Sequence, residues 1–257
     1  MPAPSDRGEL AELLAAAGFV AAAEEADELL ARAAGDAELL DALVARRLTG
    51  EPLAWITGSV SFCGLEVSVD PGVYVPRWQS EPLALRAAQR VPANGVAVDA
   101  CTGAGAIAKT LMARCPGARV VATDLDERAV ACARRNGVDA RHGDLLAPLP
   151  RELEGRVDVV VGVVPYVPTG DLRLLHRDAL TFESTLSYDG GEDGTALLRR
   201  VVGDSPRFLR HGGTLLLELG GQQADALRDD LGREGYIDVD VLRDEEGDVR
   251  GIEATLA

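Results

Sequence analysis

The stretch "VDACTGAGAIA", from Val98 to Ala108, sets the fold of the chain. Its first residues end the apolar run "GVAVDA" at 95–100, and its last residues begin a run rich in helix formers. Between the two runs, Gly103 and Gly105 let the backbone approach a ligand closely, and the N-terminus of the following helix offers free N–H donors. The stretch therefore predicts a strand, a ligand-binding loop and a helix in direct succession.

Runs typical of strands alternate with helical runs from about Ser80 onward, which is the pattern of a parallel sheet covered by helices. The predicted strands are "GVAVDA" (95–100), "RVVATDL" (119–125), "ARHGDL" (140–145), "VDVVVGVV" (157–164) and "GGTLLLELG" (212–220). Two further runs, at 236–244 and 249–257, flank the acidic turn "EEGD" and predict an antiparallel hairpin at the sheet edge. The fold class is therefore α/β.

The segment before this pattern is helical and then extended. Residues from about 8 to 48 are rich in Ala, Leu and Glu at helical spacing, and they predict three short helices that end near Gly18, Gly35 and Gly50. Alternating β-branched residues on both sides of Cys63-Gly64 predict a hairpin. We therefore expect a small helical domain at 1–52, a β-hairpin linker at 53–79 and the α/β domain at 80–257.

Composition and charge narrow the class of protein. The 257 residues are 47% apolar, which suffices for a sizeable core, and the net charge of −16 argues against broad binding to nucleic acid or anionic lipid. No apolar run approaches the roughly 20 residues of a membrane span. The opening "MPAPSDRGEL" lacks the charged and apolar regions of a signal peptide. We expect a soluble cytoplasmic protein, and the sequence does not indicate its oligomeric state.

The cysteines and histidines are scattered through the chain without metal-ligand spacing, so no metal site is predicted. Cys101 alone lies in the glycine-rich loop. The expected role of such a small residue is that of a buried thiol.

Carboxylates stand at the ends of the predicted strands. Asp99 directly precedes the loop, and Asp124 follows Gly103 by about twenty residues, where a carboxylate accepts both hydroxyls of an adenosine ribose. Asp144 ends the third strand, where an adenine amino group finds an acceptor. Each residue taken singly also fits a helix cap or a solvated turn. All three at strand ends favour a nucleoside site.

The loop leaves two cofactor classes open. It satisfies GxGxxA through Ala108, the pattern of nicotinamide dinucleotide sites. S-adenosyl-L-methionine is favoured because Asp99 precedes the loop as in the acidic-x-GxGxG motif of methyltransferases, and because the chain ends in an antiparallel strand pair. The predicted cofactor contacts are Asp99, Cys101, Thr102, Gly103, Ala104, Gly105, Asp124, Leu125, Asp144, Leu145 and Val163.

Together these strings resemble the family of glutamine-N5 methyltransferases that modify release factors, and still more a related branch whose substrate is unassigned. The likeness covers nearly the whole chain and includes "RRLTGEPLAWITG", "FCGLEVSVDPGVYVPR", "DACTGAGAIA", "ATDLDERAVACARRN", "RVDVVVGVVPYVP", "LSYDGGEDGTALLRRV" and "HGGTLLLELGGQQ". The resemblance implies a seven-stranded Rossmann-like class I methyltransferase domain behind a helical substrate-binding domain. It also implies S-adenosylmethionine as the methyl donor.

The chain departs from the family at the end of its fourth strand. The family has Asn-Pro-Pro-Tyr or Asn-x-Pro-Tyr there, whereas this chain has "VVPY", so Val163 occupies the asparagine position and Pro165 and Tyr166 remain as catalytic candidates. In the family the asparagine accepts a hydrogen bond from the substrate amide and directs it toward the methyl group. Valine accepts nothing, and a buried N–H without an acceptor costs roughly 1–3 kcal/mol. Efficient glutamine methylation is therefore not expected.

A second departure lies in the segment "PRWQSE", where the family has Pro-Arg-Pro-x-Thr-Glu close to the methyl-transfer cleft. Trp78 offers a flat surface for stacking on a ring, and an anchor at the inter-domain hinge explains it equally well. Arg77 and Glu183 are charged residues for orienting a substrate, or ordinary surface residues. The predicted acceptor contacts are Arg77, Trp78, Gln79, Glu81, Val164 and Glu183.

Four functions follow for comparison. The first is methyltransferase-type chemistry on a small molecule with an aromatic or apolar body, including alkylation or cyclisation of a specialised metabolite. The second keeps a protein glutamine as acceptor, with Gln79 or the backbone carbonyl beside Pro165 in place of the lost amide. The third is a binding module that has lost catalysis, and a dinucleotide oxidoreductase is a distant fourth.

Overall fold

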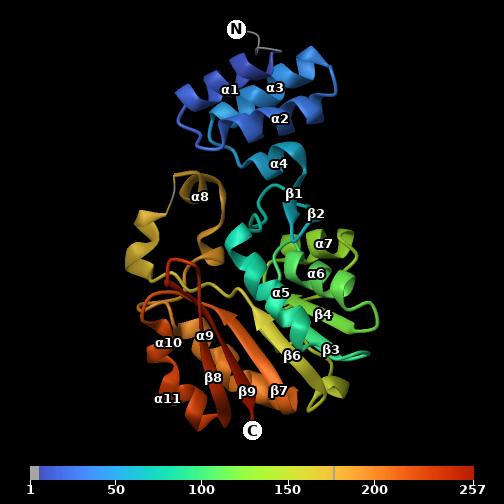
Figure 1. Ribbon diagram of the computed structural model, residues 1–257, viewed down its shortest axis with the longest axis vertical. Coiled ribbons are helices and arrows are strands. Elements are labelled where there is room, and N and C mark those ends of the chain that lie inside the picture. Colours follow the sequence, from blue (N-terminus) through green and yellow to red (C-terminus); the bar gives the residue numbers. More distant parts are fainter. Residues whose placement is uncertain (1–5, 176) are drawn as a thin grey trace.

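A computed structural model describes residues 6–175 and 177–257, and its central feature is a seven-stranded sheet (Figure 1). The strand order is β5-β4-β3-β6-β7-β9-β8. The strands are β3 (Val96–Ala100), β4 (Arg119–Asp124), β5 (Asp139–His142), β6 (Val157–Gly162), β7 (Leu209–Glu218), β8 (Tyr236–Arg243) and β9 (Val249–Leu256). The first five are parallel, and β9 pairs antiparallel with both β7 and β8. The predicted fold class is confirmed.

Two helical layers cover the sheet because its strands are apolar on both faces. Ala97, Val159 and Val161 pack toward α5 (Glu81–Arg90), α6 (Ala106–Arg114) and α7 (Glu127–Arg135). Val98 and Val160 point the other way, toward α9 (Ala196–Asp204), α10 (Gln223–Ala226) and α11 (Arg228–Arg233). Successive side chains of a strand alternate in this way, so one apolar strand serves both layers.

The helical segment has a core of its own. It comprises α1 (Arg7–Ala16), α2 (Ala22–Ala33), α3 (Ala37–Leu48) and the short α4 (Leu53–Thr57). Gly18, Gly35 and Gly50 follow the first three helices with positive φ, as the sequence predicts. The predicted hairpin is also confirmed as β1 (Ser59–Phe62) and β2 (Leu65–Ser68). The helix α4 was not predicted, because its five residues are too few for a helical period.

Short elements complete the described chain. They are η1 (Trp78–Ser80), η2 (Arg151–Leu153), η3 (Thr169–Leu174), α8 (Arg177–Phe182), η4 (Thr185–Ser187) and η5 (Ser205–Arg207). The strand predicted at 140–145 is shorter than expected, so Asp144 lies two residues beyond the end of β5 at His142. Among the described residues, no helix has both the length and the apolar character that crossing a membrane requires.

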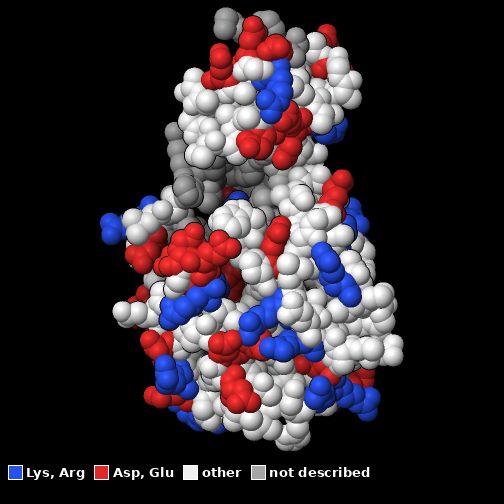
Figure 2. All heavy atoms as spheres, in the orientation of Figure 1, with Lys and Arg blue, Asp and Glu red and all other residues white. Residues whose placement is uncertain are grey.

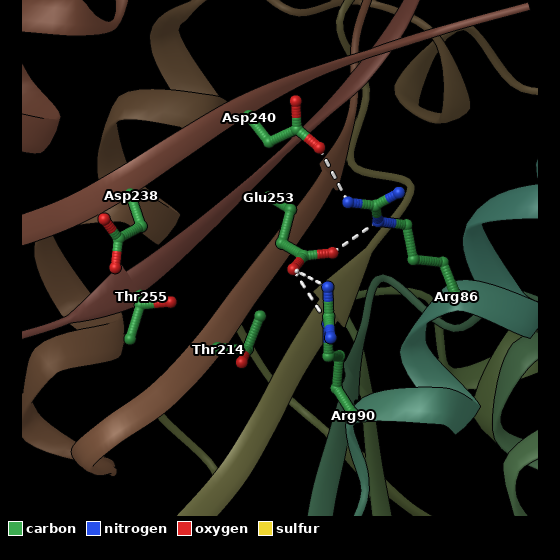
Figure 3. Close-up of a pocket in the computed structure, with 7 residues that line it drawn as sticks. All are labelled: Arg86, Arg90, Thr214, Asp238, Asp240, Glu253 and Thr255. Atoms are coloured by element: carbon green, nitrogen blue, oxygen red, sulfur yellow. Dashed lines mark hydrogen bonds and ion pairs between the residues drawn. The ribbon is translucent and has the colours of Figure 1, made fainter.

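A cluster of charges fixes α5 against the sheet (Figure 3). Glu253 of β9 accepts hydrogen bonds from Arg86 Nε at 2.5 Å and Arg90 Nε at 2.8 Å, and Arg86 also pairs with Asp240. The Glu253 side chain is only 10% exposed, so it requires these partners. Thr214, in the middle of β7, lines the hollow beside them. The cluster therefore orients α5 and the segment that precedes it.

Trp55 of α4 joins the helical segment to the rest of the chain. Its indole Nε1 donates to the Val73 carbonyl at 2.9 Å, and its ring meets Phe182 edge to face at 6.3 Å between centroids. Trp55→Ala should lower the free energy of unfolding by about 3–5 kcal/mol, because it leaves a cavity and an unpaired carbonyl. Urea denaturation measures this loss. Trp55→Phe keeps the apolar body and should lose about 1–2 kcal/mol, and equal losses for both variants would contradict this account.

Candidate active site

A cavity of about 870 Å³ opens at the carboxyl ends of β3, β4 and β6. This is where the strand order reverses, and open α/β sheets bind ligands at such a point. Of the predicted site residues, Cys101, Gly103, Asp124, Leu125, Asp144, Leu145, Val163 and Pro165 line it. Lining residues that sequence reasoning did not select are Gly72, Val73, Tyr74, Asp126, Glu127, Arg128, Ala129, Ser184, Leu186, Ser187, Asp189, Gly190, Gly191, Ala196, Leu197 and Arg200.

The glycine-rich loop is held from below by Asp99. This carboxylate is 1% exposed, and its Oδ2 accepts from Thr102 Oγ1 at 2.5 Å and from the Ala108 amide at 3.0 Å. Burial raises its pKa to about 7 despite these two donors. Asp99 therefore ties the strand end to the first turn of α6, and it does not line the cavity.

The loop backbone takes up conformations that expose its edge to the cavity. Cys101 has φ +58° and Gly103 has φ +55°, and a side chain added at Gly103 would meet open space. A left-handed non-glycine residue such as Cys101 is uncommon and marks a constrained loop. Burial strongly raises the pKa of the Cys101 thiol, which disfavours the reactive thiolate form. Thr102, Ala104 and Gly105 are buried behind this edge.

Asp124 faces the cavity from the end of β4. Its Oδ2 accepts from the Gly103 amide at 2.8 Å, and its Oδ1 accepts from the Asp126 amide at 2.9 Å. An ionised carboxylate has about four acceptor positions, so two remain for a ligand. Burial raises the pKa of Asp124, and hydrogen bonds from backbone amides oppose that rise. These features fit a carboxylate that receives a ribose diol.

The third carboxylate has a partner already. Asp144 Oδ2 pairs with Arg200 Nη2 at 2.6 Å on the rim of the cavity. Leu145 next to it is buried with φ +46°, and Leu125 is 58% exposed on the same side. Apolar side chains flanking an acceptor fit an adenine ring. The cavity and these donor and acceptor groups therefore fit S-adenosylmethionine.

The "VVPY" corner separates into exposed and buried parts. Val163 and Pro165 line the cavity, whereas Val164 is fully buried in the core. Tyr166 points away from the cavity, and its hydroxyl donates to Glu218 Oε1 at 2.9 Å. Burial raises the pKa of Glu218, and burial beside this carboxylate raises the pKa of Tyr166. The corner therefore presents hydrocarbon to the cavity.

The residues of "PRWQSE" do not line this cavity. Trp78 is 73% exposed and borders a second groove, together with Gln79, between α5 and the β8–β9 hairpin. Glu81 begins α5. Arg77 pairs with Glu183 at 2.5 Å. The sequence gives no signal for the groove, because the hairpin that completes it lies more than a hundred residues further along the chain.

Charges on the molecular surface are mixed. In Figure 2, basic and acidic side chains are interspersed over the face that is shown. Among residues 6–175 and 177–257, no three or more His, Cys, Asp or Glu side chains are grouped as a metal would require.

Residues 97–181 match the model of a methyltransferase domain family. The chain is similar to the release factor glutamine methyltransferase of Geobacter sulfurreducens, with 36% identity over 211 residues that cover 80% of this chain and 73% of that protein. It is also similar to the 4-amino-L-phenylalanine/4-methylamino-L-phenylalanine methyltransferase of Streptomyces pristinaespiralis, with 38% identity over 191 residues, 70% of this chain and 64% of that protein. The E. cuniculi Mtq2–Trm112 structure shares the fold, with TM-score 0.54, 24% identity and coverage of 72% and 99%.

Asp124→Asn should weaken the binding of S-adenosylhomocysteine about tenfold to a hundredfold, because hydrogen bonds to a charged acceptor contribute about 1.5–3 kcal/mol. Titration calorimetry measures this affinity, with the exposed Asp139→Asn as the matched control. NAD should give no binding heat with the unmodified protein. Unchanged affinity in Asp124→Asn, or tight binding of NAD, would overturn the assignment.

Asp99 makes stability depend on pH. Its pKa is about 7 in the folded chain and 3.8 ordinarily, so the folded state holds more protons than the unfolded state between these values. This contribution to stability therefore falls as pH rises from about 4 to about 7. Asp99→Asn removes this pH-dependent contribution. The difference in the free energy of unfolding, Asp99→Asn minus parent, should therefore rise over this range and then level off. Urea denaturation at several pH values measures this difference, and a flat difference would count against a raised pKa.

Proposed function

The chain belongs to the family of release factor glutamine methyltransferases, and we propose that its own acceptor is a small molecule with an aromatic or apolar body. It is a methyltransferase that uses S-adenosylmethionine, as members of this family do. One observation carries the proposal. Val163 lines the cavity at the position where the resemblance to this family implies an asparagine.

Each residue then has a defined task. Asp124 and the Gly103 edge bind the nucleoside, and the hydrocarbon of Val163 and Pro165 excludes water from the reacting atoms. S-adenosylmethionine, when bound, would supply a methyl group on a sulfonium. The lone pair of the acceptor nitrogen would form the new bond as the carbon–sulfur bond breaks, S-adenosylhomocysteine would leave, and the proton of the methylated nitrogen would pass to solvent. A displacement of this kind depends mainly on proximity and alignment.

The choice of acceptor follows from nucleophilicity. An amide nitrogen delocalises its lone pair into the carbonyl, so it requires hydrogen-bond acceptors that hold its N–H groups in the reactive direction. An aromatic amine keeps a more available lone pair and does not require them. The Streptomyces pristinaespiralis relative, which is named for a 4-amino-L-phenylalanine substrate, supports such an acceptor within this family.

Protein glutamine methylation is the alternative, and the name of the Geobacter sulfurreducens relative favours it. It would require another acceptor for the glutamine N–H groups. Gln79 borders the second groove and does not line the cavity. The backbone carbonyl beside Pro165 is then the acceptor left for this alternative.

A labelled-methyl assay should separate these functions. The unmodified protein should methylate a small aromatic amine, with 4-amino-L-phenylalanine as the probe, at least about tenfold faster than a purified release factor. Val163→Asn restores the acceptor and should raise release-factor methylation about tenfold or more. Val163→Leu, which keeps hydrocarbon at this position, is the matched control.

Stoichiometric methyl incorporation at a release-factor glutamine by the unmodified protein would contradict the proposal. Turnover of no acceptor by the unmodified protein, with glutamine methylation gained by Val163→Asn, would instead identify a binding module that has lost catalysis.

A further inference from the structure

The cavity is also lined by two segments that lie outside the cofactor loop. These are residues 72–74, which follow the hairpin, and lining residues within 184–191, which follow α8, and we call these two segments the acceptor wall. They are about 110 residues apart in sequence. Neither belongs to a long helix or to the central sheet, so specific contacts must hold them in place.

Glu183 makes the contacts that join the two segments. Its side chain is 1% exposed, its Oε1 accepts from the Val75 amide at 2.9 Å, and its Oε2 accepts from Arg77 Nη2 at 2.5 Å. The Tyr188 hydroxyl also donates to Oε2. Three donors on one buried carboxylate leave it little capacity for a ligand. Glu183 therefore holds protein segments together and does not touch the acceptor.

Aromatic packing completes the junction. The Arg77 guanidinium lies 5.2 Å from the centre of the Tyr74 ring, and Tyr74 meets Tyr188 edge to face at 5.5 Å. Tyr74 is the member of this cluster that lines the cavity. The ion pair of Arg77 and Glu183 thus fixes the orientation of the Tyr74 ring.

The wall is also joined to the "VVPY" corner. The Val167 amide donates to the Tyr188 carbonyl at 2.8 Å, and the Gly190 amide donates back to the Val167 carbonyl at 2.9 Å. A side chain at Gly190 would lie 2.7 Å from the Tyr166 Cα, so only glycine permits this approach. A displacement of residues 184–191 would therefore change the cavity beside Pro165.

We propose that Glu183 is a positioning residue that clasps the two segments of the acceptor wall, and that the clasp sets acceptor specificity by presenting the Tyr74 ring to a planar acceptor. Only the second part of this inference, the effect on acceptor specificity, rests on the proposed function. The clasp itself is a property of the folded chain. Arg77 is then also a positioning residue, which differs from the direct substrate contact expected from the sequence.

Glu183→Gln tests the clasp because it keeps the size of the side chain and removes the charge that pairs with Arg77. Glu192→Gln, at an exposed position nearby, is the matched control. Hydrogen exchange of the amides in 72–77 and 184–191 should accelerate about tenfold or more in Glu183→Gln and should not change in Glu192→Gln. The affinity for S-adenosylhomocysteine should stay within about twofold of the parent.

Kinetics with the aromatic amine probe test specificity. Glu183→Gln should raise KM about tenfold and leave kcat within about threefold, because the chemistry of the cofactor side is unchanged. Tyr188→Phe removes one donor to Glu183 and should give smaller shifts in the same direction, which keeps the test decisive if Glu183→Gln folds poorly. Unchanged exchange in both variants, or faster exchange with unchanged KM, would overturn the inference. If the parent methylates no acceptor, the proposed function fails, and the exchange data still decide whether the clasp exists.

Discussion

The Asp99 carboxylate lies buried beneath the glycine-rich loop, where the Thr102 hydroxyl and the Ala108 amide donate to it. These two bonds fix the loop between the end of β3 and the start of α6. The Gly103 amide is thereby directed at Asp124 of the neighbouring strand, and the same edge borders the cavity. The part of the site that we propose for the nucleoside thus depends on one carboxylate that does not line the cavity.

The other part of the site receives no polar side chain from the "VVPY" corner. Val163 and Pro165 give the cavity a hydrocarbon surface, while the Tyr166 hydroxyl of the same corner donates to Glu218. The cofactor side of the cavity keeps its hydrogen-bond acceptors, whereas the side chains of Val163 and Pro165 offer none. Such a site favours a nucleophile that needs alignment and no activation. The family relationship and the altered substrate position are therefore compatible.

Much of this was predictable from sequence, and the reasons are local. Apolar strands with Asp99, Asp124 and Val163 at or next to their ends predicted the sheet and the edge where Asp124 and Val163 line the cavity, because parallel strands bring their carboxyl ends together. The acceptor wall was not predictable, because residues 72–74 and 184–191 meet only through tertiary contacts of Glu183. The exposed position of Trp78 could not be predicted for the same reason, since the groove beside it is completed by the distant β8–β9 hairpin.

The most direct test of the central claim is a crystal structure of the protein with S-adenosylhomocysteine. Our account predicts that the ribose hydroxyls bind Asp124, that the sulfur lies beside Val163 and Pro165, and that the space beyond the sulfur is bounded by hydrocarbon and the Tyr74 ring. A side-chain or backbone oxygen directed at that space, positioned to receive a glutamine amide, would contradict it. So would a cavity from which the nucleoside is excluded.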